Sequence, residues 1–259
     1  MQKIPKKVTD RIASKLKAYQ SIGVSQRKKD VMEADTVTLV KDILADVFGY
    51  DKYDELTSEH QIRGTFCDLA IKISGKVKIL VEVKSAGTTL NESHLRQVVN
   101  YGANQGVEWI VLTNAVEWRL YKIKFGQPVD FEEVSTFDFT SANARSEEDV
   151  QKLYIFCREG ISTDAMSAFH QHSLVLNKFM IAQVALTEPI ASVIKREMKK
   201  LFPDVKVSSD QITNLLSNEI FRREVIEGER AKETATKLRK ARQKMLKSTE
   251  SEKSIAVEK

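Results

Sequence analysis

The chain lacks the features that mark secreted and membrane-spanning proteins. Its 259 residues include two cysteines, Cys67 and Cys157, too few for a disulfide framework, so we expect both to be small core residues. Apolar runs are only a few residues long, far below the ~20 residues that span a bilayer. The basic segment Met1 to Lys7 is followed by no apolar stretch, so we expect no export signal and a cytoplasmic location.

Proline and glycine are also scarce, with 4 and 10 copies, and no internal repeat or low-complexity segment interrupts the chain. Hydrophobic residues make up 42% and charged residues 30%, which is typical of a soluble globular protein. This length allows one large domain, or a core domain with a helical appendage.

Positive charge is in slight excess and is concentrated near the C-terminus. The formal net charge is +5, and residues 221–259 hold twelve basic and seven acidic residues, so this segment carries the whole excess. Two interpretations of the run from Arg222 to Lys247 stay open. A solvated helix with i,i+4 ion pairs is favoured over a dedicated nucleic-acid arm.

Apolar periodicity predicts an alternation of helices and strands in the first half of the chain. We expect a surface helix over 6–20, interrupted by Gly23 and Ser25, and a core helix over 28–48 that ends at Gly49. Two hairpins follow, separated by a helix over 91–105. Their strands are predicted at 65–73 with 77–83, and at 107–113 with 117–123.

Strand signals fade after Pro128, and the remaining segments have helical periodicity. Helices are predicted over 147–156, 166–186 and 189–201, and a last one begins near Ser208. We therefore predict an α/β fold: a restriction-endonuclease-like core, with a mixed central sheet flanked by helices, followed by a mainly helical C-terminal region. The predicted divisions are a basic helix (1–27), the core (28–140), a helical domain (145–247) and a disordered tail (248–259).

The strongest chemical cluster is Asp68 in the first strand of the first hairpin, with Glu82 and Lys84 in the second. Strand alternation places Glu82 and Lys84 on one face, and pairing across the hairpin brings Asp68 close to Glu82. Two nearby carboxylates among apolar residues are costly unless a cation compensates them. Taken alone, a Glu-x-Lys pair is more often a surface ion pair at a sheet edge.

The residues that flank this hairpin make the pattern more specific. Glu33 lies on the preceding helix, and Gln97 and Tyr101, four positions apart, share a face of the following one. Over residues 28–125 this pattern resembles the PD-(D/E)xK nuclease superfamily. It is similar in particular to the N-terminal nuclease domain of type I restriction enzyme R (motor) subunits and to stand-alone predicted type IV restriction endonucleases.

That resemblance implies a DNA endonuclease that depends on Mg²⁺, for which Mn²⁺ can substitute. Asp68 and Glu82 would be the metal ligands, and they would be catalytic together with Lys84 and Gln97. Glu33 and Tyr101 would support them. The sequence departs from the family in two ways: Cys67 stands where the superfamily has proline, and no Walker A or helicase motif follows, so we do not expect a complete motor subunit.

Contacts with DNA are less specified by the sequence. His94 and Arg96, just before Gln97, and Lys76 and Lys78 in the second strand are possible phosphate contacts, although an ordinary surface role at a helix start is equally compatible with the first two. His170 belongs to no zinc pattern, and we expect it at the surface.

Two functions from different classes remain. The first is a restriction-like enzyme that hydrolyses phosphodiester bonds, in defence against foreign DNA. The second is a non-catalytic DNA-binding or assembly subunit that keeps the nuclease fold and recruits a separately encoded motor or modification partner. A homodimer is possible, no membrane partner is expected, and neither the recognition sequence nor the choice between DNA, RNA and a junction is encoded in a readable pattern.

Overall fold

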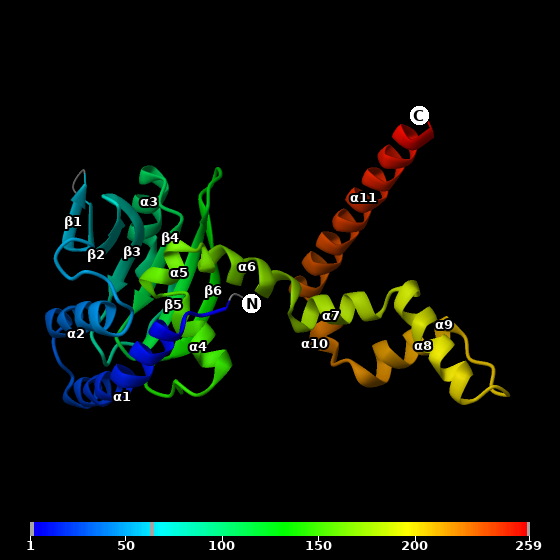
Figure 1. The fold of residues 1–259 in the computed structure, drawn as a ribbon, viewed down its shortest axis with the longest axis horizontal. Helices are drawn as coiled ribbons and strands as arrows, with labels where there is room; N and C mark the ends of the chain where they lie inside the picture. The colour runs from blue at the N-terminus through cyan, green and yellow to red at the C-terminus, as the bar shows by residue number, and fades with distance from the viewer. Residues whose placement is uncertain (1–2, 63–64, 258–259) are drawn as a thin grey trace. The chain divides into compact units, whose positions relative to one another are not determined.

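The computed structural model describes residues 3–62 and 65–257. The chain divides into two compact units, Met1–His170 and Gln171–Lys259, which are drawn in Figure 1. The first unit combines a mixed sheet with helices on both faces, and the second is helical. The fold class predicted from the sequence is therefore confirmed.

Six strands form one sheet, and their order across the sheet is their order in the sequence. β3 and β4 are parallel, while the other neighbouring pairs are antiparallel. The strands are β1 (Leu56–Ile62), β2 (Thr65–Ile73), β3 (Lys76–Val83), β4 (Trp109–Thr113), β5 (Glu117–Lys124) and β6 (Asp130–Asp138). Both predicted hairpins are confirmed, β2 with β3 and β4 with β5.

The two edge strands were not predicted. β1 contains only two strongly apolar residues, Leu56 and Ile62, and most residues of β6 are partly or fully exposed. An edge strand pairs on one side only and needs less apolar alternation than a central strand. No strand is therefore predicted over either segment.

Helices cover both faces of the sheet (Figure 1). One face packs in a large apolar core with α1 (Lys6–Lys29), α2 (Glu33–Asp46), α4 (Glu147–Tyr154) and α5 (Arg158–Ser162). The other face packs in a second core with η1 (Glu92–Leu95) and α3 (Arg96–Gln105). Cys67 and Cys157 are both buried and unbridged, as predicted. The sheet is thus the middle layer of three.

The prediction that Gly23 and Ser25 interrupt the first helix is wrong, because α1 continues to Lys29. Gly23 is buried, and a Cβ atom at this position would lie 3.8 Å from the carbonyl oxygen of Ala115. A glycine inside a helix costs only about 1 kcal/mol relative to alanine. Burial of the apolar face of α1 offsets that cost.

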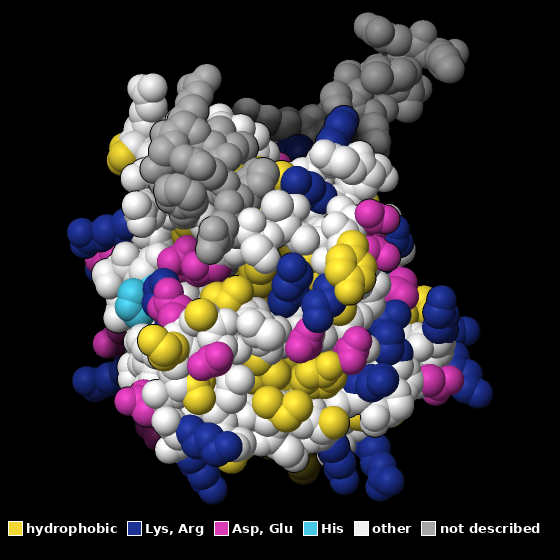
Figure 2. All heavy atoms as spheres, turned by 90° about the vertical axis from the view of Figure 1, so that its left-hand side faces the viewer, with side chains coloured by type: hydrophobic (Ala, Val, Ile, Leu, Met, Phe, Trp, Pro, Cys, Tyr) yellow, Lys and Arg dark blue, Asp and Glu magenta, His cyan; other side chains and the backbone are white. Residues whose placement is uncertain are grey.

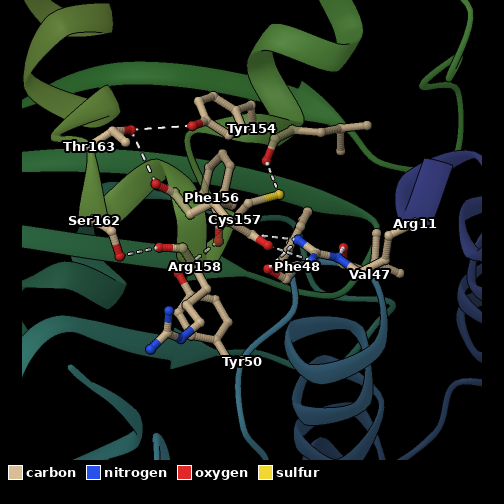
Figure 3. Close-up of polar contacts among 12 residues, drawn as sticks. Arg11, Val47, Phe48, Tyr50, Tyr154, Phe156, Cys157, Arg158, Ser162 and Thr163 are labelled. Carbon is tan, nitrogen blue, oxygen red and sulfur yellow. Dashed lines mark hydrogen bonds and ion pairs between the residues drawn. The ribbon is translucent and has the colours of Figure 1, made fainter. Parts of the chain in front are cut away.

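A polar network joins segments that are far apart in the first unit. The Arg11 guanidinium donates two hydrogen bonds of 2.7 Å to the Glu159 carboxylate, and others to the carbonyl oxygens of Val47 (3.0 Å) and Phe48 (3.1 Å). Figure 3 shows Arg11 reaching these carbonyl groups just past the end of α2. The network therefore ties α1, the end of α2 and α5 together.

The division between the units falls later than the sequence indicated. Residues from 145 onward were assigned to a separate helical domain, but Leu153 and Tyr154 of α4 pack in the core of the first unit. The apolar side of α4 is buried against the sheet core, a tertiary contact that helical periodicity alone does not reveal.

The second unit is a succession of mostly short helices. α6 (Ala165–Val175) crosses the division, and α7 (Lys178–Ala185), α8 (Glu188–Leu201), α9 (Ser209–Leu215), η2 (Leu216–Ile220), α10 (Arg223–Ile226) and α11 (Glu229–Val257) follow. The predicted helix over 166–186 is broken because the Asn177 side chain caps α7, accepting a 2.9 Å hydrogen bond from the Met180 N–H. The tail expected to be disordered from 248 is helical up to Val257.

Candidate active site

The β2–β3 hairpin brings the predicted carboxylates together. Ser74 and Gly75 have positive φ angles of 50° and 77°, as a two-residue hairpin turn requires. Leu69 pairs with Val81, and the Asp68 Oδ2 atom accepts a 2.7 Å hydrogen bond from the Val83 N–H. Asp68 therefore points at the stretch of backbone between Glu82 and Lys84.

Glu82, Lys84 and Glu33 form a linked group beside Asp68. The Lys84 Nζ atom lies 2.8 Å from Glu82 Oε1 and 3.6 Å from Glu33 Oε2. The side chains of Glu82 and Lys84 are only 16% and 20% exposed, against 47% for Glu33. Glu33, the first residue of α2, thus reaches Lys84, which directly follows β3, and one ammonium group faces several carboxylates.

Backbone and side-chain hydrogen bonds hold the segment that follows β3. The Lys84 N–H donates to the Thr113 carbonyl oxygen at 2.9 Å, which extends the parallel pairing of β3 with β4. The Ala86 N–H donates to the Thr36 hydroxyl at 3.2 Å. Thr36 is fully buried in α2, on the apolar stripe that contains Leu39. This supporting role was missed, and a lone threonine on an apolar stripe was its only signal in the sequence.

The site has an excess of negative charge. Burial raises the pKa of Glu82, the carboxylates of Asp68 and Glu33 raise it further, and Lys84 only partly opposes them. Burial lowers the pKa of Lys84, but Glu82, Asp68 and Glu33 outweigh this effect, so the pKa of Lys84 is raised overall. Burial and the carboxylates of Glu82 and Asp68 raise the pKa of the neighbouring Cys67 thiol to about 12. A cation placed here would relieve the repulsion.

The two predicted residues of α3 have different surroundings. Tyr101 is 5% exposed and packs in the core beneath α3, where burial and the adjacent Cys67 raise its pKa. Gln97 is exposed in the first turn of α3. Within the described part of the chain, no hydrogen bond joins Gln97 to Asp68, Glu82 or Lys84, so its catalytic role stays a prediction.

The possible DNA contacts are dispersed. His94 Nδ1 accepts a 3.4 Å hydrogen bond from the Asn91 N–H and completes the cap of η1. Arg96, Lys76 and Lys78 are exposed. The two lysines lie at the start of β3, and at ~3.3 Å per residue even Lys78 begins about 13 Å along the strand from Glu82. They would meet a different part of a bound nucleic acid.

His170 is not at the surface, contrary to our expectation. It is 6% exposed, and its Nε2 atom lies 2.6 Å from the Glu132 Oε1 atom. The ring also makes an edge contact with Trp109, with centroids 6.4 Å apart. A histidine inside a polar stretch such as Gln171 and His172 gives no sequence signal of this burial.

The mixed sheet, with two carboxylates and a lysine at the end of a hairpin, is the kind of site that the PD-(D/E)xK resemblance implies. Residues 39–137 match the family described as type I restriction enzyme R protein N terminus (HSDR_N), which confirms that resemblance. The matched segment contains Asp68, Glu82 and Lys84. It supports a nuclease-like role in a restriction system.

Searches of curated proteins and of solved structures gave no match. Among the described residues, no helix is long and apolar enough to cross a membrane.

Proposed function

We propose that this protein is a metal-dependent DNA endonuclease of a restriction system, with its chemistry at Asp68, Glu82 and Lys84. The observation that carries the proposal is the convergence of these three residues: Asp68 binds the Val83 N–H at 2.7 Å, and Lys84 lies 2.8 Å from Glu82 on the same hairpin. Hydrolysis of a phosphodiester needs acidic side chains that hold a metal ion, and a positive group beside the phosphate. Asp68 and Glu82 supply the acidic side chains, and Lys84 supplies the positive group.

The residues at the site fit a small hard cation. Asp68 and Glu82 offer carboxylate oxygens where negative charge is in excess, and Mg²⁺ is commonly held by one or two carboxylates with water and substrate phosphate. Within the described residues no group of three or more His, Cys, Asp or Glu side chains is placed to hold a metal. In this proposal Asp68 and Glu82 would bind Mg²⁺, or Mn²⁺ in its place, together with water and a phosphate oxygen. When bound, the ion supplies charge neutralisation and lowers the pKa of a coordinated water.

The chain's own groups have separate tasks in this proposal. Lys84 would orient the attacking water and offset the negative charge that develops on the phosphate. Glu33 would keep the Lys84 ammonium positioned at the end of β3, as its 3.6 Å contact allows. Gln97 would contact the phosphate from the start of α3.

A non-catalytic role is the second candidate, and one observation favours it. Lys84 already contacts both Glu82 and Glu33, and Asp68 already accepts a backbone hydrogen bond, so the group is held together without a ligand. In that case the fold would bind DNA and recruit a motor or modification subunit encoded separately. For both candidate functions we propose DNA as the ligand and a homodimer as the active form.

The test compares wild type with Lys84→Ala and, as a matched control, Lys72→Ala on the other strand of the same hairpin. Supercoiled, linear and single-stranded DNA and an RNA are incubated with Mg²⁺ or Mn²⁺, and cleavage is followed on gels. We expect wild type and Lys72→Ala to cut DNA, and Lys84→Ala to lose activity by a factor of about 10³, comparable to the loss of one group that stabilises the transition state.

Thermal melting separates loss of chemistry from loss of the fold. We expect Mg²⁺ to raise the melting temperature of wild type more than that of Asp68→Ala, because a ligand that binds only the folded state stabilises it by mass action. Equal shifts in the two proteins, or no cleavage by wild type on unmodified and modified DNA, would refute the nuclease proposal in favour of the binding role.

A further inference from the structure

Helix α11 carries an exposed run of cations with no acidic residue among them. Between Thr234 and Met245 the sequence holds five basic residues and neither Asp nor Glu. All five side chains are exposed. They are Lys237, Arg239, Lys240, Arg242 and Lys244. Three of them, at positions i, i+3 and i+7, lie on one side of the helix. We call Lys237, Lys240 and Lys244 the lysine face.

Among the described residues of the second unit, no ion pair neutralises the lysine face. The ion pairs described there join other residues, namely Lys178 with Glu224, and Arg196 and Lys200 with Glu197. Lys240 and Lys244 are like charges four positions apart, which destabilises a helix. Only Lys237 has an acidic residue, Glu233, within three or four positions along the helix. The i,i+4 ion pairs that the sequence favoured are therefore not present among the described residues of this segment.

Burial of apolar side chains does not stabilise this part of α11 either. Ala231, near the start of the helix, is 1% exposed, whereas Met245 is 62% exposed. Every residue from Arg239 to Met245 is exposed. A helix that buries little and has no internal ion pairs is marginal by itself in water. A bound partner of opposite charge would remove the repulsion and favour the helix.

A second copy of the chain is a poor fit for this surface. The only apolar seam of the segment consists of Leu238, Ala241 and Met245, which is narrow for a helical dimer. This seam lies beside the lysine face, so a symmetric copy would bring cations close to cations. A polyanion has the complementary charge.

We propose that the lysine face of α11 binds the phosphate backbone of duplex DNA. This inference rests on the proposed function, because duplex DNA is the substrate class proposed for the nuclease site. The three lysines span about 10 Å of helix at 1.5 Å per residue. Duplex DNA presents one negative charge per ~1.7 Å of its axis, so several phosphates face this length. Such contacts hold DNA without reading its sequence.

The experiment uses the full chain in EDTA, where no divalent ion is available and cleavage is absent. A labelled DNA duplex is titrated by fluorescence anisotropy between 50 and 300 mM salt. The triple variant Lys237→Gln, Lys240→Gln, Lys244→Gln is compared with a control of equal charge change on α1, Lys6→Gln, Lys15→Gln, Lys17→Gln. We expect the α11 variant to bind on the order of tenfold more weakly at low salt, with a salt slope smaller by about 2.7, since each duplex phosphate contact contributes ~0.9.

Circular dichroism provides a second readout. We expect added DNA to increase the helicity of wild type and of the α1 control but not of the α11 variant. Equal salt slopes for the two triple variants would overturn the inference, as would binding to vesicles of anionic lipid that depends on the lysine face while binding to the duplex does not.

The outcomes also separate this inference from the nuclease proposal. If DNA binding depends on the lysine face but wild type cuts nothing in Mg²⁺, the inference holds and the nuclease proposal fails. If cleavage depends on Lys84 while the salt slope is unchanged in the α11 variant, the nuclease proposal holds and the inference fails.

Discussion

The two units of the chain bury their apolar residues to different extents. In the first unit many large apolar side chains are fully buried, and Trp118 and Tyr121 are both 0% exposed. In the second unit Leu201 is 74% and Ile220 is 65% exposed, and the buried residues described there are few and mostly small. The first unit is therefore a stable platform for its site, while the second presents its side chains to solvent or to partners.

The two units also differ in how their surface charges are arranged. Figure 2 shows one side of the molecule, on which Lys and Arg side chains are interspersed with Asp and Glu across most of the described surface. Several charged side chains of the first unit form ion pairs, such as Arg158 with Glu55 at 2.8 Å. The run from Lys237 to Lys244 has no such pairing among described residues. Mixed charge keeps a platform soluble, and charge of one sign attracts a partner of the other.

The largest effect on stability should come from one leucine in each unit. Leu120→Ala, at a position 0% exposed in β5, should lower the free energy of unfolding by about 2–5 kcal/mol, because it leaves a cavity in the core. Leu201→Ala, at 74% exposure, should change it by less than about 0.5 kcal/mol. Urea unfolding measures both effects when tryptophan fluorescence follows the first unit, which holds Trp109 and Trp118, and far-ultraviolet circular dichroism follows the helical second unit. Equal costs would remove the contrast between the units.

Two glycines provide a comparison of packing density. A Cβ atom on Gly160 would lie 2.3 Å from the Tyr154 carbonyl oxygen, whereas on Gly228 the nearest atom, the Glu224 carbonyl oxygen, would be 3.8 Å away. We expect Gly160→Ala to destabilise the first unit by about 1–3 kcal/mol through overpacking, and Gly228→Ala to be close to neutral. Thermal unfolding of both variants tests this, and a tolerated Gly160→Ala would show that α5 is free to move.

An effect no larger than that of Gly160→Ala should come from the Arg11–Glu159 pair. The hydrogen bond from Arg11 holds the pKa of Glu159 below its usual value, burial opposing it in part. The stability that this pair contributes is therefore present above the unfolded-state pKa of glutamate and is lost as the pH falls through the lower pKa of the folded state. Arg11→Met should flatten the dependence of the melting temperature on pH over the acidic range, at a cost of about 1–3 kcal/mol near neutral pH.

Its control is Lys152→Met, which removes an exposed i,i+4 pair with Glu148 and should leave the pH dependence unchanged. If Arg11→Met and Lys152→Met gave the same profile as wild type, the Arg11 network would not be a source of acid sensitivity. The comparison of buried with solvent-screened pairs would then have to be abandoned.

The central elements could be predicted because their signals are local. The hairpin of β2 and β3 has a turn at Ser74 and Gly75 and alternating residues on both sides, so its presence follows from neighbouring residues. Local signals of this kind explain why β2 to β5 were predicted while β1 and β6, which pair at the edges, were not. The convergence of Asp68 with Glu82 also needs the register shift between Ile71 and Lys72, because the pairing of Ile73 with Lys76, continued without it, would set Asp68 opposite Val81.

Other features depend on contacts between residues that are far apart. The continuation of α1 through Gly23, the burial of His170 against Glu132, and the hydrogen bond from Ala86 to Thr36 each need a partner from another element. The contact between Lys84 and Glu33 also joins two elements, although the resemblance had already singled out Glu33. A pattern along the chain does not record such partners.

By itself, the sequence determined the class of fold, the hairpin and the identity of the residues at its end, because these depend on side-chain periodicity and on residues close together in the chain. Only the tertiary structure decided that Glu33 reaches Lys84, that α4 packs in the first unit and that the cations of α11 have no acidic partner among described residues. Burial and charge compensation are properties of the folded surface, since they are set by which distant groups meet.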